Sequence, residues 1–452
     1  MRKLIICGVA SLMLSGVAPR TFVSARQAAQ PATSAQTSQS ALDLFKAVDS
    51  YPQRRREELR AQGRRIDRET AEKIAGEQRE LAPKNAAQLA ARANLSADDL
   101  YYLGLLYNFA ARRDDALDAL RRFLAANGAP TSGAGAQLAR SLVAIYSAQR
   151  QQFDEAERAR ADYLAHEPRT PFKIYQMEVE LGAAYRRAKQ YERAAEHARE
   201  AFRLATEMKP SDLPTGARRE QLIFNAGDSL AETYSAAKQK DEALAALVEL
   251  ERLAFALPSV GLYESLRRKY ADKQDEIERA LAAKASGEQS SPPELVAAEW
   301  IGEEQPLKLA ELRGRVVLLD FWYEWCAPCR AEFPALSGWQ KKYKERGLVV
   351  VGLTDLQGTL HADAEKTREE KLDYLRKFVR DEKLTYASGV AERNDNLAAY
   401  GVSVFPTAVL IDRRGAVRYF SVGMSALATE RLGDMIEKLL KEPAPGATTQ
   451  TR

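Results

Sequence analysis

Apolar and small residues recur at helical spacing over a long stretch, from Ala41 to about residue 284, in a background of Glu, Arg and Gln with few glycines. Such a pattern favours helix over strand. Within the stretch one arrangement returns four times: a tyrosine, a polar turn, and an alanine nine or ten residues after the tyrosine. The tyrosines are Tyr107, Tyr146, Tyr185 and Tyr234, and the alanines are Ala116, Ala156, Ala194 and Ala243. A helix–turn–helix unit cannot bury its apolar face alone, so we expect neighbouring units to stack.

The pattern changes after residue 293, where strand-like and helix-like segments alternate. Apolar, strand-like runs occupy 315–322, 348–354, 407–412 and 417–423, and helical patterns occupy 329–346, 366–382 and 425–441. This alternation predicts an α/β domain at 294–442 with the sheet at its centre. Residues 285–293, rich in Ser and Pro, predict a linker, and residues 443–452 predict a flexible tail. We therefore expect a multidomain chain, with an all-α region at 41–284 in front of the α/β domain.

In the first 25 residues, positively charged residues are followed by an apolar run and then by small residues, which is typical of a secretory signal. An Arg-Lys pair follows the initial methionine and precedes the stretch LIICGVASLML, and candidate cleavage sites follow Ala18 and Ala25. We expect a signal peptide at 1–25 and a disordered leader, rich in Gln and Ser, at 26–40. The mature protein is then exported, to the periplasm or cell envelope. An uncleaved signal would instead tether it to a membrane.

Charge and cysteine content narrow the classes of partner and chemistry. The 452 residues carry 67 basic and 63 acidic side chains, a net charge of +4, which is too even to indicate nucleic acid as a partner. Of the three cysteines, Cys7 lies in the predicted signal, so only Cys326 and Cys329 are expected in the exported protein. An exported protein meets an oxidising compartment.

Two cysteines separated by two residues can be half of a zinc site, a structural disulfide or a redox couple. A structural zinc site needs four ligands, and the three histidines, His166, His197 and His361, are isolated in the sequence. We therefore expect no metal and no other cofactor. A disulfide across two residues closes too small a ring to remove much entropy from the unfolded chain. The pair is interpreted as a reversible redox couple.

The segments that flank the pair fit redox chemistry. The run RVVLLDFW predicts a buried strand that leads into the motif, and Pro328 with the residues after it predicts a helix. Cys326 would lie at the helix N-terminus, where unpaired N–H groups and the helix dipole favour a thiolate. Cys326 would then attack a partner's disulfide, and Cys329 would resolve the mixed disulfide.

Two acidic residues are candidates for moving the proton of Cys329. Asp320 interrupts an otherwise apolar strand six positions before Cys326, and Glu332 follows three residues after Cys329. A carboxylate buried beneath the site at Asp320 would have a raised pKa and could accept the proton. Glu332 could serve as a second acid–base group or define the recognition surface. The alternatives are a solvent-exposed strand end for Asp320 and an ordinary helix surface for Glu332.

Aromatic residues and a proline supply candidate substrate contacts. Trp325 would cover the thiols. Pro406 precedes a strong strand, and a cis Phe405–Pro406 bond would place backbone groups of a tight turn beside the thiols, where an extended peptide could pair with them. Phe405 and Thr407, on either side of the proline, are predicted with Trp325 to bind substrate.

The segment VVLLDFWYEWCAPCRAEFP, followed about 75 residues later by GVSVFPTAVLIDRRGAV, resembles thioredoxin-fold proteins of the exported TlpA/ResA-like branch. The resemblance covers residues 294–442 and implies a central sheet flanked by helices. It implies Cys326 as nucleophile, Cys329 as resolving thiol and Pro406 as a cis residue facing them. It matches Asp320 to the buried acid of thioredoxins. Glu332 matches an acidic position of the exported branch.

The helical stretch resembles the tetratricopeptide repeat over residues 95–255. Leu103-Gly104, Tyr107 and Ala116 fall on that family's pattern. Successive tyrosines are 39, 39 and 49 residues apart, longer than the family's period, and an irregular helical bundle is the alternative. Such repeats bind proteins, so we expect them to dock a protein partner.

The residues between the cysteines bear on the direction of electron flow. Ala327-Pro328 lacks the histidine that strong oxidants of the thioredoxin superfamily carry there, which favours a reductase. Its partners would be protein disulfide substrates and an upstream thiol electron donor, with no nucleic acid. Two other functions stay open: a peroxidase of the peroxiredoxin group, and a non-catalytic adaptor whose repeats bind partners beside a thioredoxin-fold platform.

Overall fold

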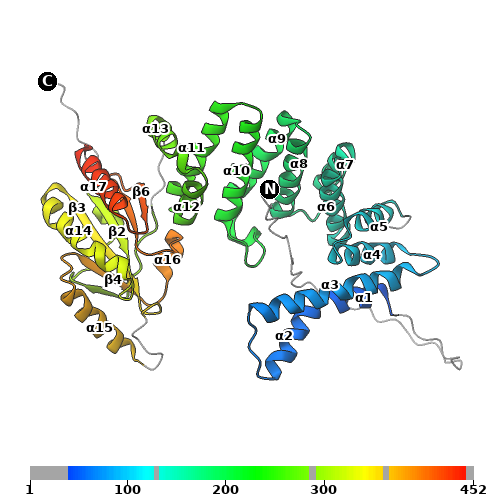
Figure 1. Cartoon of the computed structure of the whole chain (residues 1–452), viewed down its shortest axis with the longest axis horizontal. Helices are drawn as coiled ribbons and strands as arrows, with labels where there is room; N and C mark the ends of the chain where they lie inside the picture. Colours follow the sequence, from blue (N-terminus) through cyan, green and yellow to red (C-terminus); the bar gives the residue numbers. More distant parts are fainter. Residues whose placement is uncertain (1–38, 127–131, 285–291, 360–365, 444–452) are drawn as a thin grey trace. The chain divides into compact units, whose positions relative to one another are not determined.

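The computed structural model describes residues 39–126, 132–284, 292–359 and 366–443 (Figure 1). The predicted signal peptide, nearly all of the predicted leader and tail, and most of the predicted linker lie outside the described residues. The chain divides into two compact units, residues 1–219 and residues 220–452.

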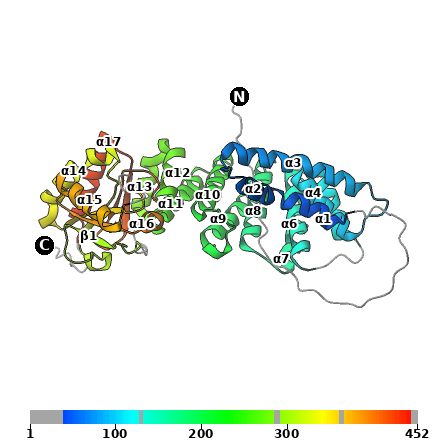
Figure 2. The ribbon, with the colours of Figure 1, turned by 90° about the horizontal axis from the view of Figure 1, so that it is seen from below.

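The described part of the first unit is helical. Its elements are α1 (Ala41–Asp49), α2 (Tyr51–Ala61), α3 (Arg68–Ala90), α4 (Ala97–Phe109), α5 (Arg113–Ala125), α6 (Ala134–Gln149), α7 (Phe153–Ala165), α8 (Pro171–Arg187), α9 (Tyr191–Glu207) and the 3₁₀ turn η1 (Pro210–Asp212). Helices α4 and α5, α6 and α7, and α8 and α9 form pairs joined by short turns, and successive pairs pack on one another (Figures 1 and 2). The predicted all-α region at the N-terminal side is thus confirmed.

Small residues let the paired helices approach closely. A Cβ atom on Gly104 would lie 2.7 Å from the Leu120 side chain, and one on Gly182 would lie 3.3 Å from the carbonyl oxygen of Ala194. The repeat alanines Ala116 and Ala194 are fully buried. The tyrosine–alanine pattern of the sequence therefore corresponds to helix pairs, and their assignment to the tetratricopeptide family stays a prediction.

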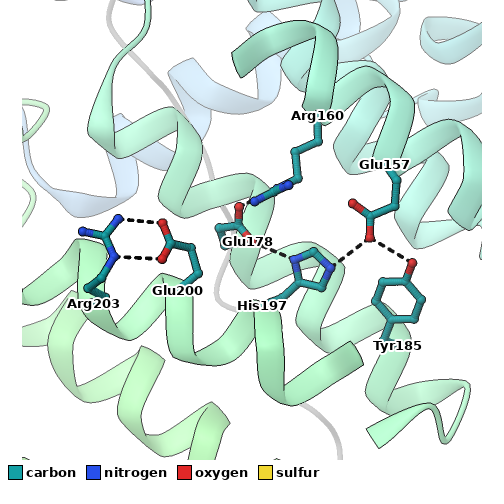
Figure 3. Close-up of polar contacts among 7 residues, drawn as sticks. All are labelled: Glu157, Arg160, Glu178, Tyr185, His197, Glu200 and Arg203. Atoms are coloured by element: carbon teal, nitrogen blue, oxygen red, sulfur yellow. Dashed lines mark hydrogen bonds and ion pairs between the residues drawn. The ribbon is translucent and has the colours of Figure 1, made fainter. Parts of the chain in front are cut away.

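A buried polar network connects three helices of this unit (Figure 3). His197 of α9 contacts Glu178 of α8 through Nδ1 at 2.7 Å and Glu157 of α7 through Nε2 at 3.0 Å. The Nε atom of Arg160 donates to the fully buried Glu178 at 2.5 Å, and the Tyr185 ring stacks on the imidazole. Burial acts to lower the pKa of His197, but the two carboxylates outweigh it and raise that pKa to about 9. At neutral pH two cations thus face two carboxylates, so each buried charge has a partner.

The second unit joins further helices to a six-stranded sheet. Its helices are α10 (Arg219–Ala236), α11 (Lys240–Ala256), α12 (Val260–Lys269), α13 (Gln274–Lys284), α14 (Ala327–Tyr343), α15 (Arg368–Asp381), α16 (Asp395–Tyr400) and α17 (Ala426–Lys441), with 3₁₀ turns η2 (Ala271–Lys273), η3 (Leu309–Leu312) and η4 (Lys344–Arg346). Its strands are β1 (Glu299–Ile301), β2 (Val316–Phe321), β3 (Leu348–Asp355), β4 (Ala387–Ala391), β5 (Thr407–Ile411) and β6 (Val417–Val422), in the order β1-β4-β3-β2-β5-β6. Strands β2, β3 and β4 are parallel, and β1, β5 and β6 pair antiparallel with their neighbours.

The central strand β2 is buried at every position, as expected for a strand covered on both faces. One face packs against α14, α15 and α17, which contribute Leu336, Leu375 and Ile436 to the same core cluster as Leu318 of β2. A mixed sheet with helices on its faces is the arrangement predicted for this region, and the thioredoxin fold class is confirmed.

Helices α11 and α12 cover the other face of the sheet at the edge strand β6. Tyr419 of β6 belongs to the core cluster under α14 and α17, and the next side chain, Phe420, points the opposite way. The Phe420 ring lies 5.4 Å from the ring of Phe255 in α11 and 5.2 Å from that of Tyr263 in α12. The compact unit that contains the sheet thus begins well before the linker predicted at 285–293. The predicted domain boundaries stay a prediction.

Replacing Tyr263 with alanine tests whether α12 and the sheet unfold together. All four tryptophans, Trp300, Trp322, Trp325 and Trp339, lie in the second unit, so their fluorescence reports on that unit alone. Tyr263 is 1% exposed, and truncating a buried aromatic side chain removes about 3–5 kcal/mol of unfolding free energy. We expect urea unfolding followed by tryptophan fluorescence to show a loss of this size in Tyr263→Ala.

The matched control is Tyr175→Ala, which truncates a buried tyrosine on α8 of the first unit. The control should leave the tryptophan-reported transition in place. A transition that does not move in Tyr263→Ala would show that α12 is not part of the unit that contains the sheet.

Candidate active site

A disulfide joins Cys326 to Cys329 at the start of α14. Strand β2 ends at Phe321, and the helix begins at Ala327 with Cys326 as its N-cap residue. The backbone N–H of Cys329 donates a hydrogen bond to Sγ of Cys326, with an N···S distance of 3.2 Å. Pro328 lies in the first helical turn, where a missing N–H leaves no helical hydrogen bond unmade. The sulfur of Cys326 therefore lies at a helix N-terminus, where partial positive charge favours an anion.

Two carboxyl groups are buried on the face of the sheet that carries α14. Side chains alternate along β2, so Asp320 faces the same way as Leu318, which belongs to the core cluster that includes both cysteines. Glu332 follows Cys329 by three residues, which places both on one side of α14. Asp320 is 1% exposed and Glu332 is 4% exposed, so both carboxyl groups have lost most contact with water.

Burial shifts the pKa values of both carboxyl groups upward. The pKa of Asp320 is raised well above its ordinary value, first by burial and then by the charge of Glu332. The hydroxyl of Tyr386 donates to Oδ2 of Asp320 at 3.3 Å and acts weakly in the opposite direction. Burial raises the pKa of Glu332 to about 7. At neutral pH the carboxyl group of Glu332 therefore exchanges between its protonated and ionised forms.

The loop before β5 brings Pro406 to the same edge of the sheet. The Phe405–Pro406 peptide bond is cis. Thr407 is the antiparallel partner of Phe321, the last residue of β2, so the proline lies level with the chain that leads to Cys326. Thr407 is fully buried, and its hydroxyl donates to the carbonyl oxygen of Val404 at 2.8 Å. The role of Thr407 in substrate binding thus has no exposed side-chain surface to support it and stays a prediction.

Two aromatic residues stand next to the active-site segments in the chain: Trp325 directly precedes Cys326, and Phe405 directly precedes the cis Pro406. Trp325 is 42% exposed, and its ring meets the Phe405 ring edge-on at 6.1 Å between centroids. Val404, next to Phe405, is also exposed. Cys326 itself is only 4% exposed, so a partner that reaches its sulfur must come close to these neighbouring apolar side chains.

Sequence patterns did not predict three polar residues of this region, Tyr323, Asp355 and Tyr386. Tyr386 donates to Asp320, and Tyr323 donates to Asp355 at the end of β3. A carboxylate directly after an apolar strand run was a signal for Asp355. Its nearness to the cysteines depends on the pairing of β2 with β3, which the sequence alone does not give.

Among the described residues, the histidines do not take part in a group that could hold a metal ion. Within residues 39–126, 132–284, 292–359 and 366–443, no group of three or more His, Cys, Asp and Glu side chains is placed to hold a metal ion. His197 is engaged with two glutamates, and His361 lies outside the described residues.

The C-terminal third of the chain is similar to known redox proteins. Residues 293–420 match the family model described as the AhpC/TSA family. "Thiol-disulfide oxidoreductase ResA" of Bacillus thuringiensis subsp. konkukian is 28% identical over 143 residues, which are 32% of this chain and 72% of that protein. The protein of the same name from Geobacillus thermodenitrificans is 31% identical over 134 residues, which are 30% of this chain and 68% of that protein.

Solved structures also match this part of the chain. The crystal structure of a thiol:disulfide interchange protein of the thioredoxin family from Chlorobium tepidum is 22% identical and covers 34% of this chain and 99% of its own, with a TM-score of 0.27. The relative from Geobacillus thermodenitrificans, matched over more than two thirds of its length, decides the family. The chain belongs to the ResA-like thiol–disulfide oxidoreductases.

Proposed function

We propose that this enzyme reduces disulfides of proteins in the cell envelope through a dithiol formed by Cys326 and Cys329. The observation that carries the proposal is the Cys326–Cys329 disulfide at the start of α14, level with the cis Phe405–Pro406 bond. Disulfide exchange needs a stabilised thiolate, which the helix N-terminus would provide at Cys326, and an intramolecular resolving group, which is Cys329. It also needs a docking surface, which the neighbouring apolar side chains would provide.

The proposed reaction moves two electrons from the dithiol to the substrate. The thiolate of Cys326 attacks one sulfur of the substrate disulfide, forms a mixed disulfide and expels the other substrate sulfur as a thiolate, which takes up a proton. Cys329 then loses its proton, attacks the sulfur of Cys326 and releases the second substrate thiol. The product is the Cys326–Cys329 disulfide that the structure contains. An upstream protein dithiol would reduce it again.

Glu332 is the better candidate to accept the proton of Cys329. General bases work best when their pKa lies near the working pH, and the pKa of Glu332 is about 7. The pKa of Asp320 is raised well above its ordinary value by burial and then by the charge of Glu332. Asp320 stays the second candidate for this role.

Export is supported by the sequence of residues 1–25, which we propose to be a signal peptide followed by a disordered leader at 26–40. In the described ranges, which start at residue 39, no helix is long and apolar enough to cross a membrane. The periplasm or cell envelope is the proposed location, with a membrane tether if the signal is retained.

The helical region at 41–284 is proposed to dock a protein partner, either the substrate or the electron donor. Its stacked helix pairs and the tetratricopeptide resemblance of residues 95–255 support this role. Residues 285–293 are proposed to link it to the thioredoxin-like domain at 294–442, with a flexible tail at 443–452.

Removing Cys326 tests the proposed activity. With dithiothreitol as electron donor, the full-length protein should speed the reduction of insulin disulfides, and Cys326→Ser should reduce the rate to the uncatalysed background. Cys7→Ser is the matched control, because that cysteine lies in the predicted signal, and it should behave as wild type.

Equal insulin rates for wild type and Cys326→Ser would contradict the proposal and favour an adaptor. Hydrogen peroxide consumption that depends on Cys326 and exceeds disulfide reduction would favour a peroxidase. The variant Cys329→Ser should accumulate a mixed disulfide with its substrate, visible as a band of higher mass that dithiothreitol removes.

Glu332→Gln should lower activity and raise stability together. The loss of a general base at pH 7 should reduce insulin reduction at least about tenfold. Burial raises the pKa of Glu332 from 4.5 to about 7, so the folded state binds the proton more tightly, and stability is lost as pH rises through this window. Glutamine does not titrate, so at pH 8 the variant should gain about 3 kcal/mol of unfolding free energy.

Urea unfolding at pH 5 and pH 8, followed by tryptophan fluorescence, measures this gain. The gain should be small at pH 5 and large at pH 8. Glu345→Gln, which changes an exposed glutamate just after α14, is the control and should alter neither quantity. A Glu332→Gln variant with wild-type activity and wild-type pH dependence of stability would contradict the proposed role.

A further inference from the structure

The turn that follows β3 lies against the segment that leads to Cys326. Strands β2 and β3 are parallel, with Phe321 opposite Leu353, so both chains leave the sheet at the same edge. Asp355 is the last residue of β3 and is only 2% exposed. A buried carboxylate requires hydrogen-bond donors.

The carboxylate of Asp355 binds two donors, one on each oxygen. The hydroxyl of Tyr323 donates to Oδ2 at 2.5 Å, and the backbone N–H of Gly358 donates to Oδ1 at 2.7 Å. The hydroxyl of Thr359 donates to the backbone oxygen of Asp355 at 2.9 Å. Trp325 completes the connection, because its indole N–H donates to the carbonyl oxygen of Gly358 at 2.9 Å. The side chains of Tyr323 and Trp325 therefore both hydrogen-bond to the turn 355–359.

The ring of Tyr323 is the buried centre of this arrangement. It is 6% exposed, stacks on Trp325 with centroids 5.2 Å apart, and meets the edge of the Phe405 ring at 4.8 Å. A Cβ atom on Gly358 would lie 2.2 Å from Cζ of Tyr323, so the ring lies directly on the backbone of the turn. Burial, together with the hydrogen bond and the charge of Asp355, raises the pKa of Tyr323, which keeps its hydroxyl a donor.

We propose that Tyr323 and Asp355 are positioning residues for the binding of protein substrates. Their hydrogen bond fixes the Tyr323 ring, and the ring contacts both the exposed indole of Trp325, next to Cys326 in the chain, and the ring of Phe405, next to the cis proline. An extended polypeptide then meets two apolar side chains that are already ordered. This inference rests on the proposed reduction of protein disulfides.

The gain from this pre-ordering should appear in substrate binding rather than in the chemical step. Ordering one large side chain on binding weakens affinity about two- to tenfold, and a side chain that is already fixed avoids that loss. A small disulfide reagent touches little of the aromatic surround, so its reduction should depend far less on Tyr323 and Asp355.

Tyr323→Phe removes the hydroxyl that bonds Asp355 and retains an aromatic ring at this position. In the full-length protein we expect the KM for insulin to rise about three- to tenfold, with kcat within about twofold of wild type. The rate with 5,5′-dithiobis(2-nitrobenzoic acid) should stay within about twofold. Asp355→Asn should act in the same direction, and the double variant should be no worse than the poorer single one, because both changes break the same contact.

The matched control is Tyr343→Phe, which removes a hydroxyl that donates to Glu437 at the opposite end of α14 and should leave every value unchanged. An insulin KM equal to that of wild type in Tyr323→Phe would overturn the inference. Equal proportional losses with insulin and with the small reagent would also overturn it, because they indicate general damage to the site.

A second measurement does not depend on catalysis. The contribution of Trp325 to the fluorescence anisotropy is obtained by comparing the protein with its Trp325→Phe variant. In the Tyr323→Phe background this contribution should fall, because the indole becomes mobile. An unchanged anisotropy would overturn the positioning role whatever the enzyme reduces. An inactive wild type with the expected loss of anisotropy would instead sink the proposed function and leave the positioning contact in place.

Discussion

The burial of Glu332 one turn after Cys329 is the constraint on which the chemistry of this site depends. Loss of water destabilises an ionised carboxylate, and this raises the pKa of Glu332 to about 7 and that of Asp320 well above its ordinary range. A negative charge on Glu332 would disfavour a thiolate at Cys326. The position of Cys326 at the start of α14 favours the thiolate, because a helix N-terminus stabilises negative charge. In the proposed mechanism, the balance of these two effects would set the ionisation of the reduced Cys326 thiol.

The scaffold around this site was largely predictable where the sequence carries long apolar runs. Strands β2, β3, β5 and β6 and helices α14, α15 and α17 fall on the predicted segments. The strand β4 was missed because its residues, ASGVA, are too small to give an apolar run, and β1 has only three residues. The packing of α11 and α12 on the sheet was also missed, because Phe255 and Tyr263 follow the same helical spacing as residues that pack helix on helix.

In the candidate site, too, some residues could be predicted from the sequence and others could not. Cys326, Cys329 and Asp320 stood out because polar residues interrupt an apolar pattern or repeat at a short spacing. The contact between Tyr323 and Asp355 could not be predicted, because the residues are 32 apart and meet only through the register of β2 with β3. Local chemistry can therefore be predicted from spacing, whereas the side chains that orient it depend on strand order. The roles assigned to individual site residues stay proposals.

The most direct test of the account is the titration of the Cys326 thiol in the reduced protein, with and without the charge at position 332. The rate of alkylation by iodoacetamide between pH 5 and pH 10 gives the pKa of this thiol. A buried carboxylate nearby disfavours a second negative charge, so Glu332→Gln should lower the thiol pKa by roughly one unit. Identical titration curves for the two proteins would contradict the account, because they would show that Glu332 and Cys326 do not share one electrostatic site.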